Sequence, residues 1–494
     1  MIDNRHLLEF TIMKIILDTI ANILTGIFDF FLEIVDGIQA QTKTQKHTLN
    51  ASFGDSQNLL SRRHKGFCVD GKRFLSLKQS RSNMVVIAPS GKGKTQISIF
   101  PFLLNTTGNC SFIINDVSGE LGQTIPYLKS QGIQTMVLDF GQKTGLYFNP
   151  LEGCKGNITQ MKKIAKTLMK ASTSNTQKQD FWSISAEDTM VLFMQYILES
   201  EPLIYHNLGN VYRLIIEYQG SSEIIEAMMS AKATESVWKK FKALTGASDN
   251  TRKSIIASAL SALSFIGDNP MLCDITSRSN INFSDFRKES MALFVQIPVS
   301  DAQFYAPMLS LFFQEFYRFG FSKIPTDNEL DIMMVLDEFD TLTAISDFSS
   351  IISNSRKFKI PQQIILQSES QLSKYGNQAK TILNNCNVKC YYGGLGDETY
   401  QMEKILGKYE YQPDKESKHT KTRSLMTTSE IREMKDEILV LSSGEKPLKI
   451  KVTEAYKQRK LMKRLQMDDL TEEAEIIESF SIEYIPLEEY KNKQ

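Results

Sequence analysis

A short stretch near residue 90 constrains this chain more than any other. Residues 84–87 are apolar, residues 88–93 are small and turn-forming, and apolar residues at 97, 99 and 100 suit the start of a helix. Strand, loop and helix in this order are typical of a phosphate-binding loop, where glycines let backbone N–H groups surround an anion at a helix N-terminus. We therefore predict that nucleotide phosphates contact Ala88, Pro89, Ser90, Gly91, Lys92, Gly93, Lys94 and Thr95.

Two side chains of this loop carry the predicted chemistry. Lys94 is expected to reach the β- and γ-phosphates of ATP, and Thr95 is expected to place its hydroxyl on Mg²⁺. Ala88 stands where a first glycine is usual, and the match is weaker there because alanine avoids positive φ. A chance turn rich in Gly and Lys is the alternative, and the flanking strand and helix patterns argue against it.

The apolar pattern along the chain predicts an α/β fold with a mainly parallel sheet. Further buried strands are expected at residues 111–116, 135–139, 291–298 and 331–337, with helical segments between them. Residues 66–80 alternate and turn at Asp70-Gly71, which predicts a hairpin that leads into the phosphate loop. From about 155 to 275 only helical periodicity is present, which predicts an inserted all-α domain.

A second group of candidate residues follows two later strands. The strand over 332–336 ends in Asp337 and Glu338, which suit a Mg²⁺ ligand and a base that orients or deprotonates the attacking water. Acids often end strands, so this pair gains its meaning from the phosphate loop. Gln367 ends another strand, where an amide beside the γ-phosphate could sense it. The alternative is that Gln367 is an ordinary residue at a strand end.

Composition leaves the partner open, because Lys+Arg and Asp+Glu both number 57. Any nucleic-acid site must then concentrate its basic groups locally. The six cysteines are scattered and complete no zinc set, which predicts reduced, buried thiols.

Polar residues over 7–38 trace one acidic helical stripe, which predicts an amphipathic docking helix more than a membrane span. Burial of this helix in the protein's own core is the alternative.

Eight motifs in order resemble the VirD4/TraG/TraD-type coupling proteins, the ATPases of bacterial conjugation. The resemblance runs from about residue 50 to 457, and its most specific element is Gln-Ser-Glu-Ser-Gln-Leu. The motifs are at 88–95, 116–120 (Asp-Val-Ser-Gly-Glu), 148–151 (Phe-Asn-Pro-Leu), 181–182 (Phe-Trp), 336–339 (Leu-Asp-Glu-Phe), 355–357 (Ser-Arg-Lys), 367–372 and 384–387 (Asn-Asn-Cys-Asn).

This resemblance implies a RecA-like motor, hexameric when active, that uses ATP and Mg²⁺ to move relaxase-bound single-stranded DNA to a type IV secretion channel. It implies that Arg356 acts in trans on the ATP of a neighbouring subunit, and that the all-α domain takes part in substrate recognition. Two departures stand out: the family's two N-terminal membrane spans are not evident, and Ser118 replaces a common Lys. The expected location is the cytoplasmic face of the bacterial inner membrane, peripheral or held by a separate membrane-anchor partner.

Two alternatives to a single-stranded DNA motor stay open: a ring ATPase that acts on duplex DNA or powers channel assembly, and a recruitment platform that uses ATP only as a switch. Lys357 and Lys359 are candidate DNA-phosphate contacts. A basic block at 446–464 precedes an acidic block at 468–489, which is either solvated or recruits a basic relaxosome protein. The expected domains are a docking helix (1–40), a linker (41–65), a RecA-like domain in two parts (66–154 and 276–457), the all-α insertion (155–275) and a charged tail (458–494).

Overall fold

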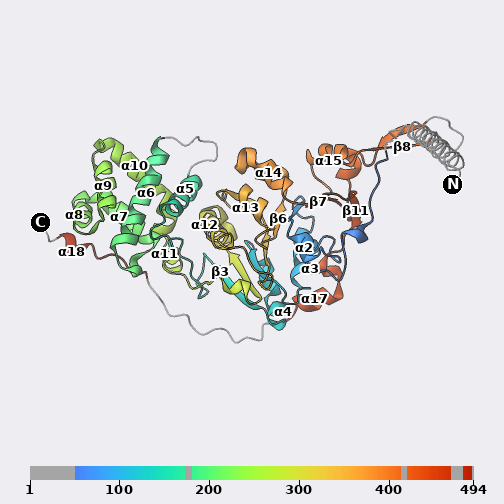
Figure 1. Ribbon diagram of the computed structural model, residues 1–494, viewed down its shortest axis with the longest axis horizontal. Helices are drawn as coiled ribbons and strands as arrows, with labels where there is room; N and C mark the ends of the chain where they lie inside the picture. The colour runs from blue at the N-terminus through green and yellow to red at the C-terminus, as the bar shows by residue number, and fades with distance from the viewer. Residues whose placement is uncertain (1–49, 173–180, 413–419, 469–481, 492–494) are drawn as a thin grey trace, which may run out of the picture. The chain divides into compact units, whose positions relative to one another are not determined.

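The structure is a computed structural model that describes residues 50–172, 181–412, 420–468 and 482–491 (Figure 1). The chain divides into a larger unit, Phe53–Met402 with Thr427–Gln494, and a smaller one, Met1–Ser52 with Glu403–Met426. Each unit is described by itself. The predicted helix over 7–38 lies outside the described residues and stays a prediction.

A nine-stranded sheet forms the centre of the larger unit, in the order β11-β10-β7-β1-β6-β5-β2-β4-β3. Neighbouring strands from β7 to β3 are parallel, and β10 and β11 add an antiparallel edge. This confirms the predicted α/β class with a mainly parallel sheet. The strands are β1 (Met84–Ile87), β2 (Ser111–Asn115), β3 (Gln134–Asp139), β4 (Met291–Gln296), β5 (Ile332–Leu336), β6 (Gln362–Leu366), β7 (Val388–Tyr392), β10 (Glu437–Ser442) and β11 (Leu448–Lys451).

Helices cover both faces of this sheet, which explains why β1, β2, β5 and β6 are buried along their whole length and why β1 and β5 are apolar throughout. Against one face pack α3 (Phe100–Leu103), α4 (Ile125–Ser130) and α17 (Arg459–Leu465). On the other, the Tyr317 hydroxyl of α12 (Ala302–Gly320) donates to Gln362 of β6. Shorter helices are α2 (Leu77–Ser80), α13 (Phe348–Asn354), α14 (Ala379–Asn384), α15 (Glu398–Leu406) and α16 (Thr428–Arg432).

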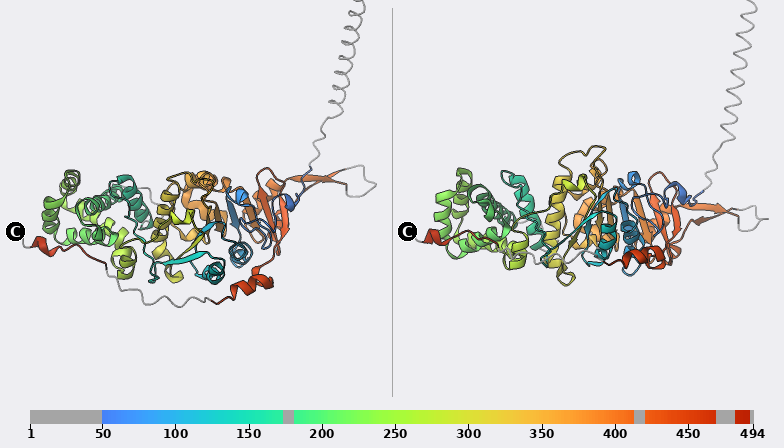
Figure 2. Two further views of the ribbon diagram at one scale, coloured as in Figure 1. Left: turned by 60° about the horizontal axis from the view of Figure 1, so that its bottom comes forward. Right: turned by 90° about the horizontal axis from the view of Figure 1, so that it is seen from below.

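The described residues between 158 and 275 form helices without a strand, and the two views in Figure 2 show them as a group beside the sheet. α6 lies at the centre of this group, since it packs against α5, α7, α9 and α10 and is buried on every side from Thr189 to Leu198. The helices are α5 (Ile158–Ser172), α6 (Phe181–Ser200), α7 (Leu208–Gly220), α8 (Ser222–Lys232), α9 (Glu235–Thr245), α10 (Asp249–Gly267) and α11 (Pro270–Ile275).

Two local predictions around residue 65 need correction. The linker predicted over 41–65 is too long, because Leu59 and Leu60 are buried in the core of the larger unit and were hidden by polar neighbours in the sequence. The hairpin predicted over 66–80 shrinks to isolated bridges, including one between Cys68 and Phe74. Its second arm ends early because Ser76 and Gln79 form a capping box that begins α2.

Part of the predicted charged tail (458–494) packs against the rest of the protein and is not a solvated charge block. Its first part forms α17, where Leu461 is buried and the Arg464 guanidinium donates to the Leu104 carbonyl and the Asn105 side chain. The same guanidinium lies 4.6 Å from the centre of the Tyr127 ring. Arg464 therefore holds α17 to the part of the chain that contains the sheet, so the charge pattern alone misjudged the surroundings of this residue.

The smaller unit contains a two-stranded antiparallel ribbon, β8 (Lys408–Tyr411) and β9 (Lys421–Ser424). Among the described residues, the helices are too short or too polar to cross a membrane.

One buried asparagine ties together the strands that carry the candidate site. Asn83, just before β1, has a left-handed backbone with φ of 61°. Its side-chain amide donates to the carbonyls of Ile352 and Asn385, both at 3.1 Å. Its side-chain oxygen accepts from the Ser355 hydroxyl at 2.9 Å and from the Gln362 backbone at 3.0 Å. Asn83 therefore fixes the start of β1 against the segments before β6 and β7.

We expect Asn83→Ala to lower the free energy of unfolding by about 3 kcal/mol or more, since each buried group left unpaired costs about 1–3 kcal/mol. Urea denaturation followed by circular dichroism measures this loss. Asn83→Gly serves as a control, because glycine accepts the positive φ and isolates the loss of the side-chain hydrogen bonds. A loss below about 1 kcal/mol in both variants would contradict the proposed importance of this network.

Candidate active site

The sheet topology brings the predicted site residues to one edge. Strand β6 lies between β1 and β5, and all three are parallel, so their carboxyl ends meet. The phosphate loop follows β1, Gln367 follows β6, and Asp337 follows β5. A cavity of about 1730 Å³ is lined there by Lys94, Thr95, Asp337, Glu338 and Gln367. Candidate residues that are far apart in the sequence thus share one site.

The loop conformation explains its glycines and its one departure from the motif. Gly91 and Gly93 have φ of 74° and 72°, a region that side chains with a Cβ rarely adopt. Ala88 is buried with its N–H donating to the Leu366 carbonyl, and its φ is not positive. Alanine is therefore tolerated at position 88, where the backbone needs no glycine.

The helix after the loop begins with a widened turn. Residues Thr95–Ile99 form a π-helical turn, in which the Phe100 N–H donates to the Thr95 carbonyl. Pro101 follows in α3. Proline has no backbone N–H to donate, and its ring crowds the carbonyl group of the preceding turn, so a regular α-helical turn is disfavoured at this point. Single π turns of this kind often occur at functional sites.

Lys94 is held at the mouth of the loop. Its ammonium donates to the carbonyls of Ala88 at 3.0 Å and Pro89 at 3.3 Å. Burial lowers the pKa of Lys94, and the carboxylates of Asp337 and Glu338 act in the opposite direction. The protein thus compensates the positive charge of Lys94 only in part, which favours the binding of an anionic ligand beside it.

The two acids after β5 have distinct surroundings. Burial, with the neighbouring Glu338 carboxylate, raises the pKa of Asp337 to about 7. The Asn115 side chain donates to the Asp337 carbonyl at 2.6 Å, which fixes the end of β5 against β2. Glu338 is exposed and has φ of 49°, a strained backbone for a residue with a side chain. This turn directs the Glu338 side chain into the cavity.

Sequence reasoning gave no role to Glu120, which lines the same cavity. Its position depends on Asp116, a buried acid at the tip of β2 that accepts from the N–H groups of Leu121 and Gly122, both at 3.0 Å, and from Gln296 at 2.8 Å. Burial is the main cause that raises the pKa of Glu120. In the sequence, the two acids at positions 116 and 120, with a glycine at 119 between them, could have indicated that Glu120 belongs to the site.

Lys374 was also missed, and it connects the two parts of the site. Its ammonium donates to the carbonyls of Phe339 at 3.0 Å, Asp340 at 3.1 Å and Leu342 at 2.7 Å, all in the loop after Glu338. Lys374 belongs to the 3-10 segment Glu369–Gln378 that follows Gln367. It therefore fixes the loop of the acids against the segment that carries the candidate sensor.

Burial lowers the pKa of Lys374 to about 8. As pH rises through that value the ammonium loses a proton, and a neutral amine has two N–H donors for three carbonyls. We expect ATP hydrolysis to decline as pH rises through about 8. A pH–rate profile tests this, with Lys374→Arg as the matched control, because arginine keeps its charge and should move the decline to higher pH. An unchanged profile in Lys374→Arg would contradict this role.

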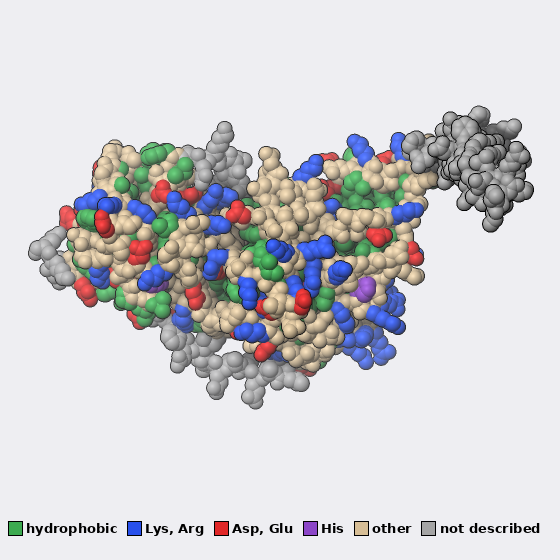
Figure 3. Space-filling model, in the orientation of Figure 1, with side chains coloured by type: hydrophobic (Ala, Val, Ile, Leu, Met, Phe, Trp, Pro, Cys, Tyr) green, Lys and Arg blue, Asp and Glu red, His purple; other side chains and the backbone are tan. Residues whose placement is uncertain are grey.

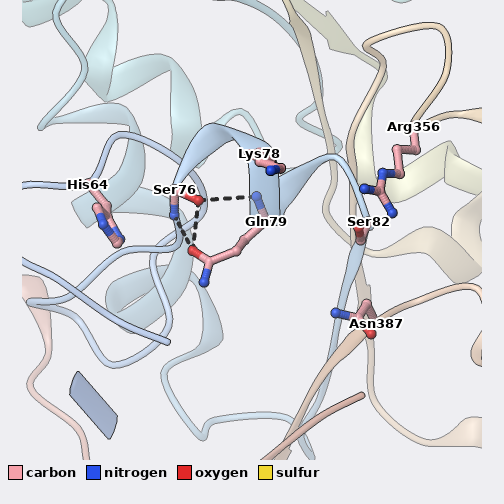
Figure 4. Close-up of a pocket in the computed structure, with 7 residues that line it drawn as sticks. All are labelled: His64, Ser76, Lys78, Gln79, Ser82, Arg356 and Asn387. Atoms are coloured by element: carbon pink, nitrogen blue, oxygen red, sulfur yellow. Dashed lines mark hydrogen bonds between the residues drawn. The ribbon is translucent and has the colours of Figure 1, made fainter. Parts of the chain in front are cut away.

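Arg356 lies away from this cavity. It precedes β6, so it is at the amino edge of the sheet, whereas the phosphate loop is at the carboxyl edge. Arg356 borders a separate pocket of about 490 Å³ together with Lys78 of α2 (Figure 4). The other lining residues are His64, Ser76, Gln79, Ser82 and Asn387.

The two lysines predicted to contact DNA differ. Lys359 is buried, and its ammonium donates to the carbonyls of Thr326, Asp327 and Glu329. The prediction that Lys359 contacts DNA phosphates is therefore wrong, since its donors are engaged inside the protein. Lys357 is exposed and stays a candidate. Elsewhere on the face in Figure 3, Lys and Arg side chains gather around α17.

Comparison with known proteins identifies the family. Residues 36–478 match the family of the type IV secretory system described as conjugative DNA transfer. The chain belongs to this family. Among curated relatives, VirD4 of Rhizobium radiobacter is 26% identical over 443 residues, which cover 83% of this chain and 61% of VirD4. VirD4 of Agrobacterium fabrum is 24% identical over 408 residues, which cover 76% of this chain and 59% of that protein. The chain thus spans about three-fifths of their length.

Solved structures agree on the fold of this chain. The bacterial conjugative coupling protein TrwB, in a trigonal form with sulphate, aligns with a TM-score of 0.64 at 15% identity and covers 82% of this chain and 92% of its own. TrwB in complex with ADP and Mg²⁺ aligns with a TM-score of 0.63, also at 15% identity, over 82% of this chain and 93% of its own. At this identity the likeness establishes the fold.

Proposed function

We propose that this chain is an ATP-hydrolysing coupling protein that recruits relaxase-bound single-stranded DNA and drives it to a type IV secretion channel. The observation that carries the proposal is the convergence of Lys94, Thr95, Asp337, Glu338 and Gln367 on one cavity. Membership of the conjugative DNA transfer family supports the choice of DNA as cargo.

ATP and Mg²⁺ fit the residues of this cavity. The glycine-rich loop offers backbone N–H groups for phosphate, and a Cβ at Gly91 would meet no atom within 4 Å, so the loop is open on that side. The Thr95 hydroxyl and the Asp337 carboxylate are hard oxygen ligands that suit Mg²⁺. When bound, Mg²⁺ neutralises charge on the phosphates. TrwB, which has this fold, was solved with ADP and Mg²⁺.

The protein groups then have separate tasks. Lys94 exchanges its contacts with the carbonyls of Ala88 and Pro89 for phosphate oxygens. Glu338 holds and orients the attacking water from its strained turn, and Gln367 lies between the phosphate loop and the acids, where its amide contacts the γ-phosphate. Lys374 positions the loop of the acids relative to Gln367.

Arg356 completes the site of a neighbouring subunit. The five residues of β6 separate it from the edge with the phosphate loop, which is about 17 Å at 3.3 Å per residue. Its own ATP is therefore out of reach, and a second copy must supply the arginine. A ring of six subunits meets this requirement, with each Arg356 stabilising charge on the phosphoryl group of the next subunit.

The remaining partners belong to the same proposal. Single-stranded DNA, relaxase and other relaxosome proteins, and components of the secretion channel are the expected partners, with Lys357 as a candidate contact to DNA phosphate. The expected location is the cytoplasmic face of the bacterial inner membrane, peripheral or through a separate membrane-anchor protein.

The test is the rate of ATP hydrolysis by the full chain with single-stranded DNA, with duplex DNA of the same length, and without DNA. We expect single-stranded DNA to raise the rate several-fold more than duplex DNA does. Equal or greater stimulation by duplex DNA would favour the ring ATPase that acts on duplexes. No stimulation, with relaxase binding retained, would favour a recruitment platform that uses ATP only as a switch.

A further inference from the structure

The last described segment of the chain lies on the all-α domain. Residues 482–491 follow α17 in sequence, yet their short helix α18 (Glu488–Lys491) packs against α8. Figures 1 and 2 show this segment beside the helices of the all-α group in each view. A segment predicted as part of a charged tail thus has a defined binding surface.

One buried side chain binds the backbone of this segment. Asn210 of α7 is 0% exposed. Its side-chain N–H donates to the Glu483 carbonyl at 2.9 Å, and its side-chain oxygen accepts from the Ile485 N–H at 3.0 Å. Asn210 therefore pairs with one acceptor and one donor of the same backbone segment, two residues apart. Main-chain pairing of this kind binds a peptide irrespective of most of its side chains.

Side-chain pockets supply the rest of the contact. Ile485, Leu487 and Tyr490 are buried, whereas Pro486, Glu488 and Glu489 between them are exposed. Lys232 lies 5.6 Å from the centre of the Tyr490 ring and is itself paired with the buried Glu201 at 3.1 Å. The surface therefore accepts apolar side chains at two alternate positions, 485 and 487, and a tyrosine at 490 beside the cation of Lys232.

The other end of the groove fits closely as well. A Cβ at Gly209 would come within 2.8 Å of the end of the Ile482 side chain and 3.1 Å of the Cys273 sulfur, so a larger residue at position 209 would displace the Ile482 side chain. Arg213 lies 5.0 Å from the centre of the Tyr484 ring, and Cys273 is buried beneath the segment. Arg213 and Lys232 give the rim positive charge, which suits the acidic residues of the segment.

We propose that this face of the all-α domain is a peptide-binding groove, which the chain's own residues 482–491 fill as a displaceable ligand. When the segment leaves, the groove takes an acid-rich segment of another protein with the same spacing of apolar residues and tyrosine. The segment is held by the two hydrogen bonds of the Asn210 side chain and by its three buried side chains, Ile485, Leu487 and Tyr490. Its tethering to the same chain raises its effective concentration and keeps the groove closed at rest.

The experiment uses the full chain and a fluorescein-labelled synthetic peptide of residues 482–491, with fluorescence anisotropy as the measurement. Ile485→Asp combined with Leu487→Asp releases the tail in an otherwise intact chain, since two carboxylates cannot enter apolar pockets unpaired. We expect this variant to bind the peptide at least 10-fold more tightly than the natural chain. Adding Asn210→Ala should weaken that binding at least 10-fold, and a peptide with both aspartates should not bind.

Cys273 supplies a second measurement that needs no added peptide. All six cysteines are buried, so a thiol reagent should react slowly with the natural chain. Release of the tail should speed modification at one thiol, and Cys273→Ser should abolish that gain. The proposal is overturned if the released variant fails to bind the peptide, if Cys273 stays protected, or if the variant loses cooperative unfolding, because the segment would then be an integral part of the domain.

Discussion

Lys94→Ala is expected to lower the rate of ATP hydrolysis by about 10²–10³-fold, the range for loss of one preorganised donor to a developing negative charge. The Lys94 ammonium donates to the carbonyls of Ala88 and Pro89. Its positive charge is only partly compensated, because burial lowers its pKa more than the carboxylates of Asp337 and Glu338 raise it. The substitution removes the cation that we expect to contact the nucleotide phosphates. Steady-state phosphate release measures the rate, and DNA transfer should be lost with it.

Lys92→Ala is the matched control for this prediction. Lys92 is a lysine of the same loop, but its side chain extends over Gly394 rather than across the loop carbonyls. Its backbone N–H survives the substitution. We expect less than about a 10-fold loss for Lys92→Ala. Comparable losses for both lysines, or normal DNA transfer by Lys94→Ala, would contradict the assignment of Lys94.

Arg356→Ala is expected to lower the rate by about 10³-fold or more, as for an arginine supplied to phosphoryl transfer by a partner. Nucleotide affinity of the isolated chain should change little, because Arg356 is at the opposite edge of the sheet from the phosphate loop. Lys78→Ala, which removes another cation from the pocket of Arg356, is the control and should keep most of the activity.

Mixing the two inactive variants separates action in trans from action within one chain. A subunit with Lys94→Ala still offers Arg356, and a subunit with Arg356→Ala still offers its phosphate loop. In an equal mixture roughly a quarter of head-to-tail interfaces combine both intact halves. Activity should therefore reappear on mixing. Absence of recovery, in assemblies shown to contain both variants, would exclude the shared site.

Local sequence pattern was sufficient for the elements that make the site. The apolar runs before Lys94 and Asp337 are buried strands, and loop glycines have the positive φ that the motif requires. Such features depend on residues near in sequence, so they are readable without a fold. The pattern failed where a tertiary contact overrides composition. Lys359 belongs to a basic run yet is buried against three carbonyls, and Leu59 is a core residue within a polar stretch.

The sequence by itself determined the α/β class, the phosphate loop, and the acids and amide that follow later strands. The tertiary structure decided which of these meet: β6 lies between β1 and β5, which places Gln367 beside the loop and the acids and puts Arg356 at the far edge. It also decided the contacts of Lys374 and Asn210, because their hydrogen bonds are made to backbone groups distant in sequence. Backbone partners leave no pattern in a sequence, since every residue offers the same carbonyl and almost every residue the same N–H.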